Sequence, residues 1–575
     1  MNIFLYFKSL IYTAVENTYP KILSDNEIKV EYPKNEDYGD LSSNVSIIIA
    51  KKKKLNPRDI AKELSSILLA NEYISEISIE GAGFLNFKIK PYFWHKFLKK
   101  LVNLGHNYPK IDIGNGEKIN VEFVSANPTG PLHLGHAKGA VFGDVISNLL
   151  SKCGYNVIRE FYINDAGNQI KTLTKSLEIR YKQLLGEKIE LDKDCYPGEY
   201  LIDIATILKD EFKNKLDTLT NNDREEFLKN FAVERILKII KDDLSKLGVI
   251  HDYFISEKKL IEQNKVESCI YFLKEKNLLY KGILDKPKSE ENNDWESKEQ
   301  ILFKSTEFGD DIDRAVIKSN GEYTYFVSDI AYHLDKIKRG FNNMVLLLGA
   351  DHIGYKKRLT SVVRALSDGK ANLNIKICQL VKLLRNGEQI KMSKRSGNFI
   401  SLKKVIEEIG SDALRFAILS KSSDTLLEID VEKLKQQNKD NPIFYVQYAS
   451  ARAGSILRKG INMGIDINNI HDKDIDLTPL KSEYDISLIK ILALYPKIIT
   501  ACLNNLDPHK ITYYLYDLAC VFHQIWSKGT KEENIKFIIE DDVNLTKARI
   551  FLVHSVKLVI TSGLQILGIK ALEKM

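Results

Sequence analysis

Cysteine is scarce in this sequence, with six residues among 575. They are scattered along the chain, and no CxxC pair or histidine cluster stands at the spacing of metal ligands. Disulfide frameworks and structural zinc sites need such groupings, so we expect neither. The six are Cys153, Cys195, Cys269, Cys378, Cys502 and Cys520.

Long apolar runs are also missing, since no window approaches the roughly 18 uninterrupted apolar residues of a membrane-spanning helix. The N-terminal run from Ile3 to Val15 contains Lys8, has no basic segment before it, and follows a helical period. It therefore predicts an amphipathic helix rather than a targeting signal. We expect a cytoplasmic protein with no membrane partner.

Neither sign of charge dominates the composition. Lys and Arg number 84 against 77 Asp and Glu, which gives a net charge of +7 and a pI of about 8.7. The small basic excess permits a polyanionic partner such as RNA without requiring one. A Lys-rich and Asn-rich composition inherited from an AT-rich genome explains the same excess.

The chain is too long for one hydrophobic core, because cores stop growing at about 250 to 300 residues. Residues 1–105 combine a helix with two short alternating stretches around a glycine turn, which is typical of a small α+β domain. Residues 412–575 are dominated by helical apolar periods and predict a helical bundle.

Residues 106–411 alternate predicted strands, at 119–124 and 344–348, with helices. This order favours a Rossmann-type parallel sheet, whose ligands lie beyond the carboxyl ends of the strands. A charged, helix-rich stretch at about 185–300 is interpreted as an insertion of helices and loops. The fold class is therefore α/β, with a small α+β domain before it and an all-α domain after it.

The most informative segment runs from Glu122 to His136. Within it, His133 and His136 bracket Gly135 where a helix is predicted to begin. Free N–H groups and the helix dipole attract phosphate to such a position, and imidazoles can donate hydrogen bonds as charge builds on the α-phosphate. The pattern indicates attack on ATP, although paired histidines at a helix start often serve only as capping or core groups.

A second cluster, Lys391-Met392-Ser393-Lys394, lies on a loop of small residues. Two lysines there suit a mobile cationic clamp on the β and γ phosphates of departing pyrophosphate. A solvated lysine-rich loop is the alternative for any single KxxK in this chain. Both motifs in this order, on an α/β background, favour the clamp.

At these residues the sequence resembles class I aminoacyl-tRNA synthetases, whose signatures are HIGH and KMSKS. The resemblance implies an aminoacyl-adenylate intermediate and Mg²⁺ accompanying ATP. Asp351-His352 resembles a segment that lines the ATP ribose and adenine, although as bare sequence it equally closes a turn. The implied catalytic residues are His133, His136, Lys391 and Lys394, and the implied ATP contacts add Gly135, Asp351, His352, Met392 and Ser393.

Further segments resemble the arginyl-tRNA synthetases in particular. The Ser-x-Asn-Pro lead-in to His133 is one of them, and the likeness spans nearly the whole chain. The others are residues 39–44 and 81–87 in the N-terminal domain, 196–200 in the catalytic domain, and 412–415 with 445–452 in the anticodon-binding helices. Because the KMSK lysines are intact, this chain does not need the lysine that some of these enzymes carry at the position of Gly130.

A planar guanidinium requires a carboxylate placed for two parallel hydrogen bonds, and Asp329 meets that requirement. The resemblance implies that Tyr325 and Asp329 hold the guanidinium, that Ser125 and Asn127 lie near the amino and carboxylate groups, and that Glu122 completes the pocket. From the sequence alone, Asp329 is equally well a helix N-cap before residue 330.

The resemblance also implies how tRNA(Arg) is held. The D-loop would meet Phe84 and Asn86, and the anticodon would meet Tyr445, Tyr448, Arg452 and the terminal Met575. Aromatic faces and cations commonly recognise unstacked bases, but an aromatic row at helical spacing is more often core. The family needs bound tRNA before it activates arginine, so the same is implied here.

Three other functions remain open from the sequence. Another class I synthetase, for glutamine or cysteine, shares the two motifs. A nucleotidyltransferase shares the HxGH loop but needs no long helical tail, and a tRNA-binding scaffold derived from a synthetase would be expected to lose the motif residues. We expect a monomer that uses arginine, ATP and tRNA(Arg), without a DNA partner.

Overall fold

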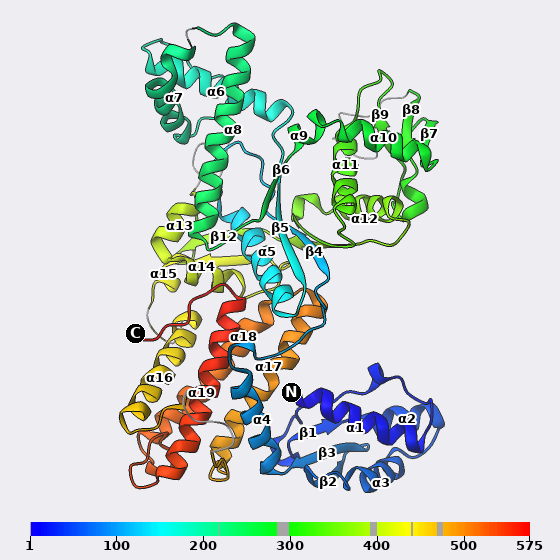
Figure 1. Ribbon diagram of the computed structural model, residues 1–575, viewed down its shortest axis with the longest axis vertical. Coiled ribbons are helices and arrows are strands. Elements are labelled where there is room, and N and C mark those ends of the chain that lie inside the picture. Colours follow the sequence, from blue (N-terminus) through cyan, green and yellow to red (C-terminus); the bar gives the residue numbers. More distant parts are fainter. Residues whose placement is uncertain are drawn as a thin grey trace. The chain divides into compact units, whose positions relative to one another are not determined.

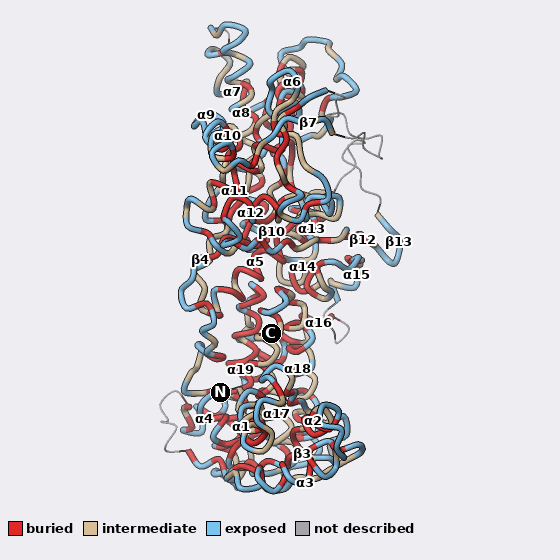
Figure 2. The backbone as a smooth tube through the Cα atoms, turned by 90° about the vertical axis from the view of Figure 1, so that its right-hand side faces the viewer, coloured by how far each residue is buried: buried red, intermediate tan, exposed pale blue. Residues whose placement is uncertain are grey.

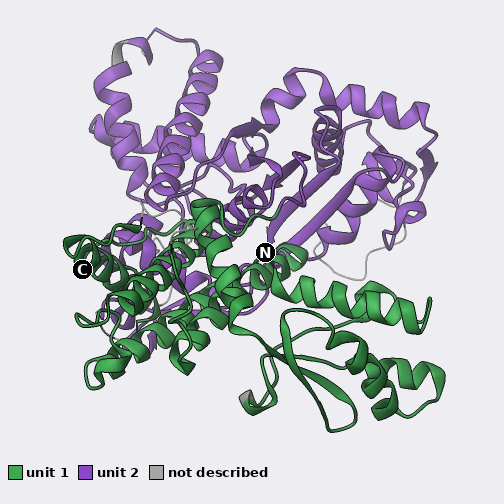
Figure 3. Ribbon diagram, turned by 60° about the horizontal axis from the view of Figure 1, so that its bottom comes forward, with its two compact units in different colours: residues 1–111, 438–506, 510–575 green, residues 112–437, 507–509 purple. Residues whose placement is uncertain are grey.

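A computed structural model describes residues 2–216, 218–284, 298–390, 400–436, 438, 441–467 and 475–575. The chain divides into two compact units (Figure 3). Unit 1 comprises residues 1–111, 438–506 and 510–575, and unit 2 comprises residues 112–437 and 507–509. The boundaries of these units differ from those of the three expected domains. The expected domain boundaries remain predictions.

The N-terminal part of unit 1 has the expected α+β character. Its first helix, α1 (Ile3–Thr18), begins where the Asn2 side chain accepts hydrogen bonds from two backbone N–H groups. The two alternating stretches form the antiparallel strands β2 (Ile74–Glu80) and β3 (Phe84–Ile89), as predicted. A third strand, β1 (Leu41–Ser43), pairs with the other edge of β3. Helices α2 (Val45–Lys53), α3 (Pro57–Leu68) and α4 (Pro91–Leu104) complete this part.

The C-terminal part of unit 1 is the predicted helical bundle (Figure 1). Its long helices are α16 (Pro442–Asn462), α17 (Glu483–Asn505), α18 (His509–Gly529) and α19 (Val543–Ile566). By length and composition α17 and α19 resemble membrane spans, but 78% of the apolar window of α19 is buried inside the protein (Figure 2). An ion pair of 3.1 Å between Arg549 and Asp485 joins these two helices, which pack as core helices of the bundle.

The two parts of unit 1 pack against each other although they are distant in sequence. The Tyr32 hydroxyl donates to the Lys490 carbonyl at 2.5 Å, and the Lys490 ammonium lies 2.6 Å from the Asp40 carboxylate. His95 hydrogen-bonds to the Leu480 carbonyl at 3.0 Å. The first hundred residues therefore share one compact unit with the last hundred.

Unit 2 is built on a five-stranded parallel sheet in the order β11-β10-β4-β5-β6. The chain lays down β4, β5 and β6 in one direction and then adds β10 and β11 on the other side of β4, so the strand order reverses between β4 and β10. Ligands of such sheets bind outside the carboxyl ends at this point. The strands are β4 (Lys118–Glu122), β5 (Asn156–Ile163), β6 (Tyr253–Ser256), β10 (Asn343–Gly349) and β11 (Asn372–Cys378).

The stretch at 185–300 was expected to be an insertion outside the sheet, and this expectation was partly wrong. It contains the helices α7 (Tyr200–Leu216) and α8 (Asn221–Lys246), but β6 pairs with β5 and belongs to the main sheet. Helix α6 (Asn168–Leu184) packs with α7 and α8. Short helices α9 (Glu257–Glu262) and α10 (Lys265–Glu275) follow β6.

A second lobe of unit 2 has a small antiparallel sheet of β7 (Leu279–Gly282), β8 (Gln300–Phe303) and β9 (Arg314–Ile317). Its apolar core includes residues of α11 (Tyr325–Lys338) and α12 (Tyr355–Leu366). Because α11 begins at Tyr325 with Thr324 as its N-cap, Asp329 lies inside the helix. The alternative that Asp329 caps this helix is therefore wrong.

The segment after β11 forms a further small sheet with helices beside it. Strands β12 (Val381–Arg385), β13 (Glu388–Gln389) and β14 (Leu427–Asp430) form a three-stranded sheet, next to which lie α13 (Leu402–Ile409), α14 (Ser411–Ile418) and α15 (Val431–Leu434). Residues 412–437 were expected to open the C-terminal bundle, but they belong to unit 2 and include a strand. Strand β14 departs from the helical pattern that dominates residues 412–575, and the boundary at 412 remains a prediction.

Candidate active site

The predicted site residues of unit 2 follow the carboxyl ends of neighbouring parallel strands. Strand β4 ends at Glu122 and β10 ends at Gly349, and the two strands pair with Leu346 opposite Glu122. The histidine motif follows β4, and Asp351-His352 follows β10. The structure thus brings both segments to the place where the strand order reverses, as the sequence predicted.

His133 and His136 stand at the start of helix α5 (Leu134–Lys152) with their rings stacked 3.9 Å apart. The Nδ1 atom of His133 accepts the Gly135 N–H at 3.1 Å, and Nδ1 of His136 accepts the His133 N–H at 3.3 Å. A neutral imidazole with an accepting Nδ1 carries its proton on Nε2. Each ring therefore caps the start of the helix with its Nδ1 atom and carries its proton on Nε2.

The segment that returns after residue 399 lies against this motif. Ser401 forms an antiparallel bridge with His133, and the Leu402 N–H donates to the Leu132 carbonyl at 2.8 Å. On the other flank, the Ile390 N–H donates to the Leu383 carbonyl at 2.9 Å. The predicted clamp residues Lys391, Met392, Ser393 and Lys394 lie outside the described residues.

The turn between β4 and α5 is strained. Val124 and Ser125 adopt positive φ angles of 70° and 38°, a region that β-branched residues rarely occupy. Strain of this kind persists only where the surroundings impose it, and it is common at binding sites. The Tyr200 hydroxyl fixes the same turn by donating to the Thr129 carbonyl at 2.6 Å. A side chain at Gly130 would place its Cβ 3.0 Å from that hydroxyl, which leaves no room for a compensating lysine without movement of Tyr200.

Glu122 is buried and already has partners. Lys336 of α11 lies 2.5 Å from one carboxylate oxygen, and the Ser125 hydroxyl donates to the other at 3.0 Å. That hydroxyl also accepts the Tyr162 N–H at 3.1 Å. Glu122 and Ser125 therefore hold the turn against α11. A ligand bound to either side chain would share it with the Lys336 or Tyr162 contact.

A second buried carboxylate holds α11 against β5. Glu160 accepts two hydrogen bonds from Arg339, at 2.6 and 2.9 Å, and one from the Tyr332 hydroxyl at 2.6 Å. Burial raises the pKa of Glu160, but the hydrogen bonds from Arg339 and Tyr332 and the charges of Lys336 and Arg339 together outweigh it, so that the pKa lies below its usual range. Together with Lys336, these contacts fix the face of α11 that carries Asp329.

Asp329 shares its surroundings with carboxylates from other elements. Burial, together with Glu257 and Glu122, raises the pKa of Asp329 to about 7, and Arg358 opposes the rise. Burial and Asp165 likewise raise the pKa of Glu257. A cation such as a guanidinium would relieve this repulsion, because an opposite charge stabilises the ionised carboxylates.

Sequence reasoning missed Glu257, Asp165 and Tyr162, whose charges or burial are coupled to those of Asp329 and Glu122. Burial and the charges of Glu257, Asp329, Glu122 and Asp165 all raise the pKa of Tyr162. Glu257 directly follows β6, and Asp165 follows β5 by two residues. Acidic residues just beyond strand ends were the available signal, but β6 had not been recognised as a strand.

The remaining predicted ligand contacts are more exposed. Asn127 donates its amide to the Gln169 side chain at 2.9 Å, and Tyr325 is 67% exposed at the start of α11. Asp351 and His352 are exposed, with a carboxylate to imidazole distance of 3.4 Å. Among the described residues no group of three or more His, Cys, Asp and Glu side chains is placed to hold a metal ion.

The predicted D-loop contacts differ in exposure. Phe84 is 42% exposed and is available for stacking. Asn86 is only 3% exposed, and its amide nitrogen has no hydrogen-bond partner in the described part of the chain. A base-edge contact by Asn86 therefore requires the surrounding residues to move.

Three of the predicted anticodon residues, Tyr445, Tyr448 and Arg452, form a cluster on α16 that packs against His523 and Trp526 of α18. The Arg452 guanidinium donates to the Tyr448 hydroxyl at 2.8 Å, contacts His523 at 2.6 Å, and lies over the rings of Tyr448 and Trp526. Tyr445 packs on the same His523 with ring centroids 4.4 Å apart. Tyr448 is exposed, so this cluster has a packed inner side and one exposed aromatic face; the terminal Met575 is exposed as well.

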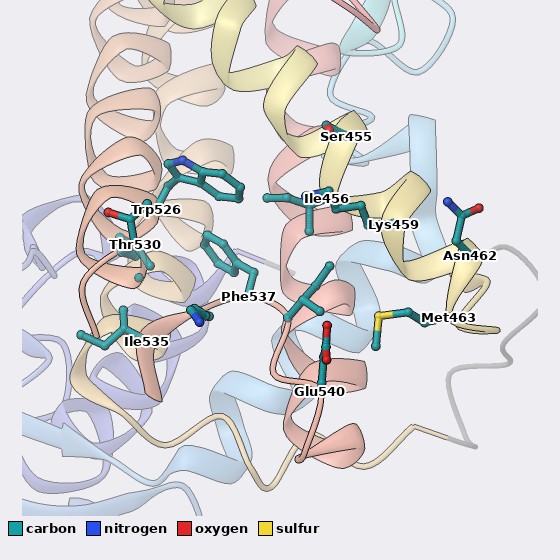
Figure 4. Close-up of a pocket in the computed structure, with 14 residues that line it drawn as sticks. Ser455, Ile456, Lys459, Asn462, Met463, Trp526, Thr530, Ile535, Phe537 and Glu540 are labelled. Atoms are coloured by element: carbon teal, nitrogen blue, oxygen red, sulfur yellow. The ribbon is translucent and has the colours of Figure 1, made fainter. Parts of the chain in front are cut away.

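Trp526 also lines a cavity of about 540 Å³ in unit 1 (Figure 4). Its walls come from α16, α18 and the segment around Phe537, and they are mainly apolar, with Lys459, Lys536 and Glu540 among them. The cavity contains none of the predicted nucleotide-binding residues. It lies in the helical bundle and is not part of the candidate active site.

Three family models together match most of the chain. Residues 98–449 match the catalytic domain of class I tRNA synthetases (R), residues 6–89 match the arginyl tRNA synthetase N-terminal domain, and residues 446–575 match the DALR anticodon-binding domain. Helix α14, with the Asp412-Ala413-Leu414-Arg415 sequence, precedes the last of these matches.

Full-length relatives give the same result. The arginine–tRNA ligase of Wolbachia pipientis wMel is 46% identical over 581 residues and covers 100% of both chains. That of Ehrlichia ruminantium (strain Welgevonden) is 46% identical and covers 95% of this chain and 94% of its own. The solved arginyl-tRNA synthetase of Plasmodium falciparum has a TM-score of 0.74 at 20% identity over 100% of this chain and 99% of its own, and so shares the fold.

Proposed function

This chain belongs to the arginyl-tRNA synthetase family, and we propose that it joins L-arginine to tRNA(Arg) through an arginyl-adenylate formed at the carboxyl edge of the five-stranded sheet. As a class I ligase of this family it attaches arginine to tRNA at the expense of ATP, for protein synthesis. The observation that best supports the proposed site is the bridge between Ser401 and His133, because it brings the flank of the lysine motif onto the histidine motif.

In the first step, an arginine carboxylate oxygen attacks the α-phosphorus of ATP, and the bond to pyrophosphate breaks. The Nε2 groups of His133 and His136 would donate to the α-phosphate oxygens, where negative charge increases in the transition state. Lys391 and Lys394 would hold the departing pyrophosphate, with Mg²⁺ arriving bound to ATP. Gly135, Met392, Ser393, Asp351 and His352 are proposed to line the nucleotide site.

The arginine side chain would enter between α11 and the strand ends. We propose that Asp329 pairs with the guanidinium and that Tyr325 covers it, because burial and the neighbouring Glu257 and Glu122 raise the pKa of Asp329 and a further cation there would offset this repulsion. Glu122 and Ser125 would act mainly by holding the turn, given their contacts with Lys336 and Tyr162. Asn127 is proposed to contact the amino and carboxylate groups.

In the second step, a ribose hydroxyl at the 3′ end of tRNA attacks the arginyl carbonyl, and AMP leaves. The D-loop is proposed to meet the exposed Phe84, with Asn86 behind it. The anticodon is proposed to meet Tyr445, Tyr448, Arg452 and Met575. We further propose that the protein works as a cytoplasmic monomer without DNA or membrane partners.

Charging of purified tRNA with labelled amino acids tests the function directly. We expect arginine to be attached, and lysine and glutamine to give only background, because neither places a planar cation on Asp329. Lys394→Ala should severely lower activation while leaving tRNA binding nearly unchanged. Charging with glutamine instead of arginine would overturn the proposal, and full activity of Lys394→Ala would overturn the clamp.

A further inference from the structure

Helix α5 carries a buried lysine just after the histidine motif. Lys138 follows His136 by two residues and is 0% exposed, with the buried Ala137 and Val141 beside it on the same helix. Lysine is almost never fully buried unless its ammonium is paired with an opposite charge. In the described part of the chain Lys138 takes part in no ion pair, and its ammonium instead donates to the Thr425 carbonyl. Packing alone does not account for a lysine at this position.

The acceptor of this hydrogen bond lies in the loop between α14 and β14. The Lys138 ammonium is 2.6 Å from the Thr425 carbonyl oxygen. The loop is folded on itself, because the hydroxyls of Ser422 and Thr425 share a hydrogen bond of 2.7 Å. A hydrogen bond from an ionised donor is stronger than one between neutral groups. The ammonium therefore fastens the residues just before β14 to the first part of α5.

The same loop is also fixed to the segment that leads into β12. The Gln379 N–H donates to the Ser423 carbonyl at 2.9 Å. The Leu427 N–H donates to the Leu380 carbonyl at 3.2 Å, and from there β12 and β14 run in parallel. Helix α5 packs against both β12 and α14 (Figure 1). Lys138 therefore holds the small sheet of β12, β13 and β14 against α5.

The lysine motif begins where this small sheet ends. Strand β13 leads into it, and the Ile390 N–H donates to the Leu383 carbonyl of β12 at 2.9 Å. The other flank of the motif is attached to the start of α5 directly, through the bridge between His133 and Ser401. Both flanks are therefore connected to α5, one by that bridge and the other through Lys138 and the small sheet.

We propose that Lys138 is a positioning residue for arginine activation, whose ammonium holds the small sheet on α5 and thereby keeps the strands that lead into the lysine motif aligned with His133. This inference rests on the proposed function of that site. Because Lys138 is fully buried, it acts through the two motifs rather than on a substrate. A buried contact between rigid elements can fix the geometry of groups that such elements carry.

The test is tRNA-dependent pyrophosphate exchange by Lys138→Met. The matched control is Lys421→Met, because Lys421 is exposed on the same loop. We expect Lys138→Met to lower kcat about tenfold or more with the KM for arginine nearly unchanged, since misplaced groups affect the transition state. Lys421→Met should match the wild type in both constants.

A double variant separates positioning from a general loss of structure. If Lys138 acts through the lysine motif, its removal should have little further effect in a protein that already lacks Lys394. We therefore expect the kcat of the double variant Lys138→Met, Lys394→Ala to lie within about threefold of that of Lys394→Ala alone. A general loss of structure would instead lower kcat by the same factor in both backgrounds.

Two results would overturn the proposal: wild-type kcat in Lys138→Met, or losses that multiply in the double variant. Lys138→Gln, which is neutral and polar, serves the same two comparisons if the methionine variant fails to fold. Failure of the proposed function is distinguishable, since then the wild-type protein itself would show no exchange with arginine and tRNA.

Discussion

The ionisation of single carboxylates has measurable consequences for this protein. Asp329 can pair with a guanidinium only when ionised, and its pKa in the free protein is raised to about 7. We therefore expect the KM for arginine to fall as the pH rises from 6 to 8 and to level off above. Asp329→Asn should raise this KM about 100-fold, since a buried charge-assisted pair is lost.

Initial rates of charging at varied arginine concentration and pH provide the measurement. Asp335→Asn is a suitable control, because Asp335 lies on the same helix but pairs with Lys265 and Arg339. This control should leave the KM for arginine unchanged. A KM that does not depend on pH in the wild type would contradict the assignment of Asp329.

Burial of the Asp243 carboxylate in α8 should lower stability at neutral pH. A carboxyl whose pKa rises from 3.8 to about 6 on folding binds its proton more tightly in the folded state. Stability from this group is complete at low pH and is lost as the pH rises through about 6, by at most about 3 kcal/mol. Asp243→Asn should therefore unfold at a higher temperature than the wild type at pH 7.5, and the difference should shrink by pH 4.5.

Thermal unfolding of both proteins at the two pH values checks this expectation. A lower unfolding temperature for Asp243→Asn at pH 7.5 would mean that the carboxylate stabilises the fold.

At the scale of elements, a buried ion pair between Asp144 and Arg415 joins α5 to α14. Arg415 also donates to the Leu247 carbonyl at the end of α8, at 3.0 Å. Removing Arg415 leaves the buried Asp144 without its close partner, since Arg159 lies 3.9 Å away. Arg415→Met should therefore destabilise unit 2 by about 3 to 5 kcal/mol, and the double variant Asp144→Leu, Arg415→Met should recover much of that loss. Urea unfolding of the two single variants and the double variant measures the coupling. Additive losses would contradict the importance of this pair.

Elements with a long apolar period could be predicted from the sequence, and the structure confirmed them. Helix α1, strands β2, β3, β4 and β10, and the C-terminal helices are examples. Strands β1, β6 and β14 contain only three or four residues, too few to show a period. Their pairing depends on partners far away in sequence, which local patterns do not report.

The same limit applies to the candidate site. The histidine motif could be predicted because it lies within one turn and its helix. The partners of Glu122, in contrast, include Lys336, which is 214 positions further along the chain. Such pairs form only when the sheet brings strand ends together, and Glu257 could be expected there only once β6 was recognised as a strand.

At the scale of the whole molecule, we expect arginine activation to require tRNA. Pyrophosphate exchange with arginine and ATP alone should be nearly silent and should appear when tRNA(Arg) is added. The measurement compares labelled pyrophosphate incorporation with and without tRNA, with a non-cognate tRNA as the control. Robust exchange in the absence of tRNA would contradict this prediction.

Unit 1 is discontinuous, and this has a consequence for how the protein is made. Tyr32 and Asp40 bind the segment around Lys490, so they gain their partners only after more than four hundred further residues have been synthesised. The five parallel strands, in contrast, all lie within one continuous stretch. On the ribosome the nucleotide-binding half can fold first, while the N-terminal segment stays exposed to chaperones until translation is almost complete.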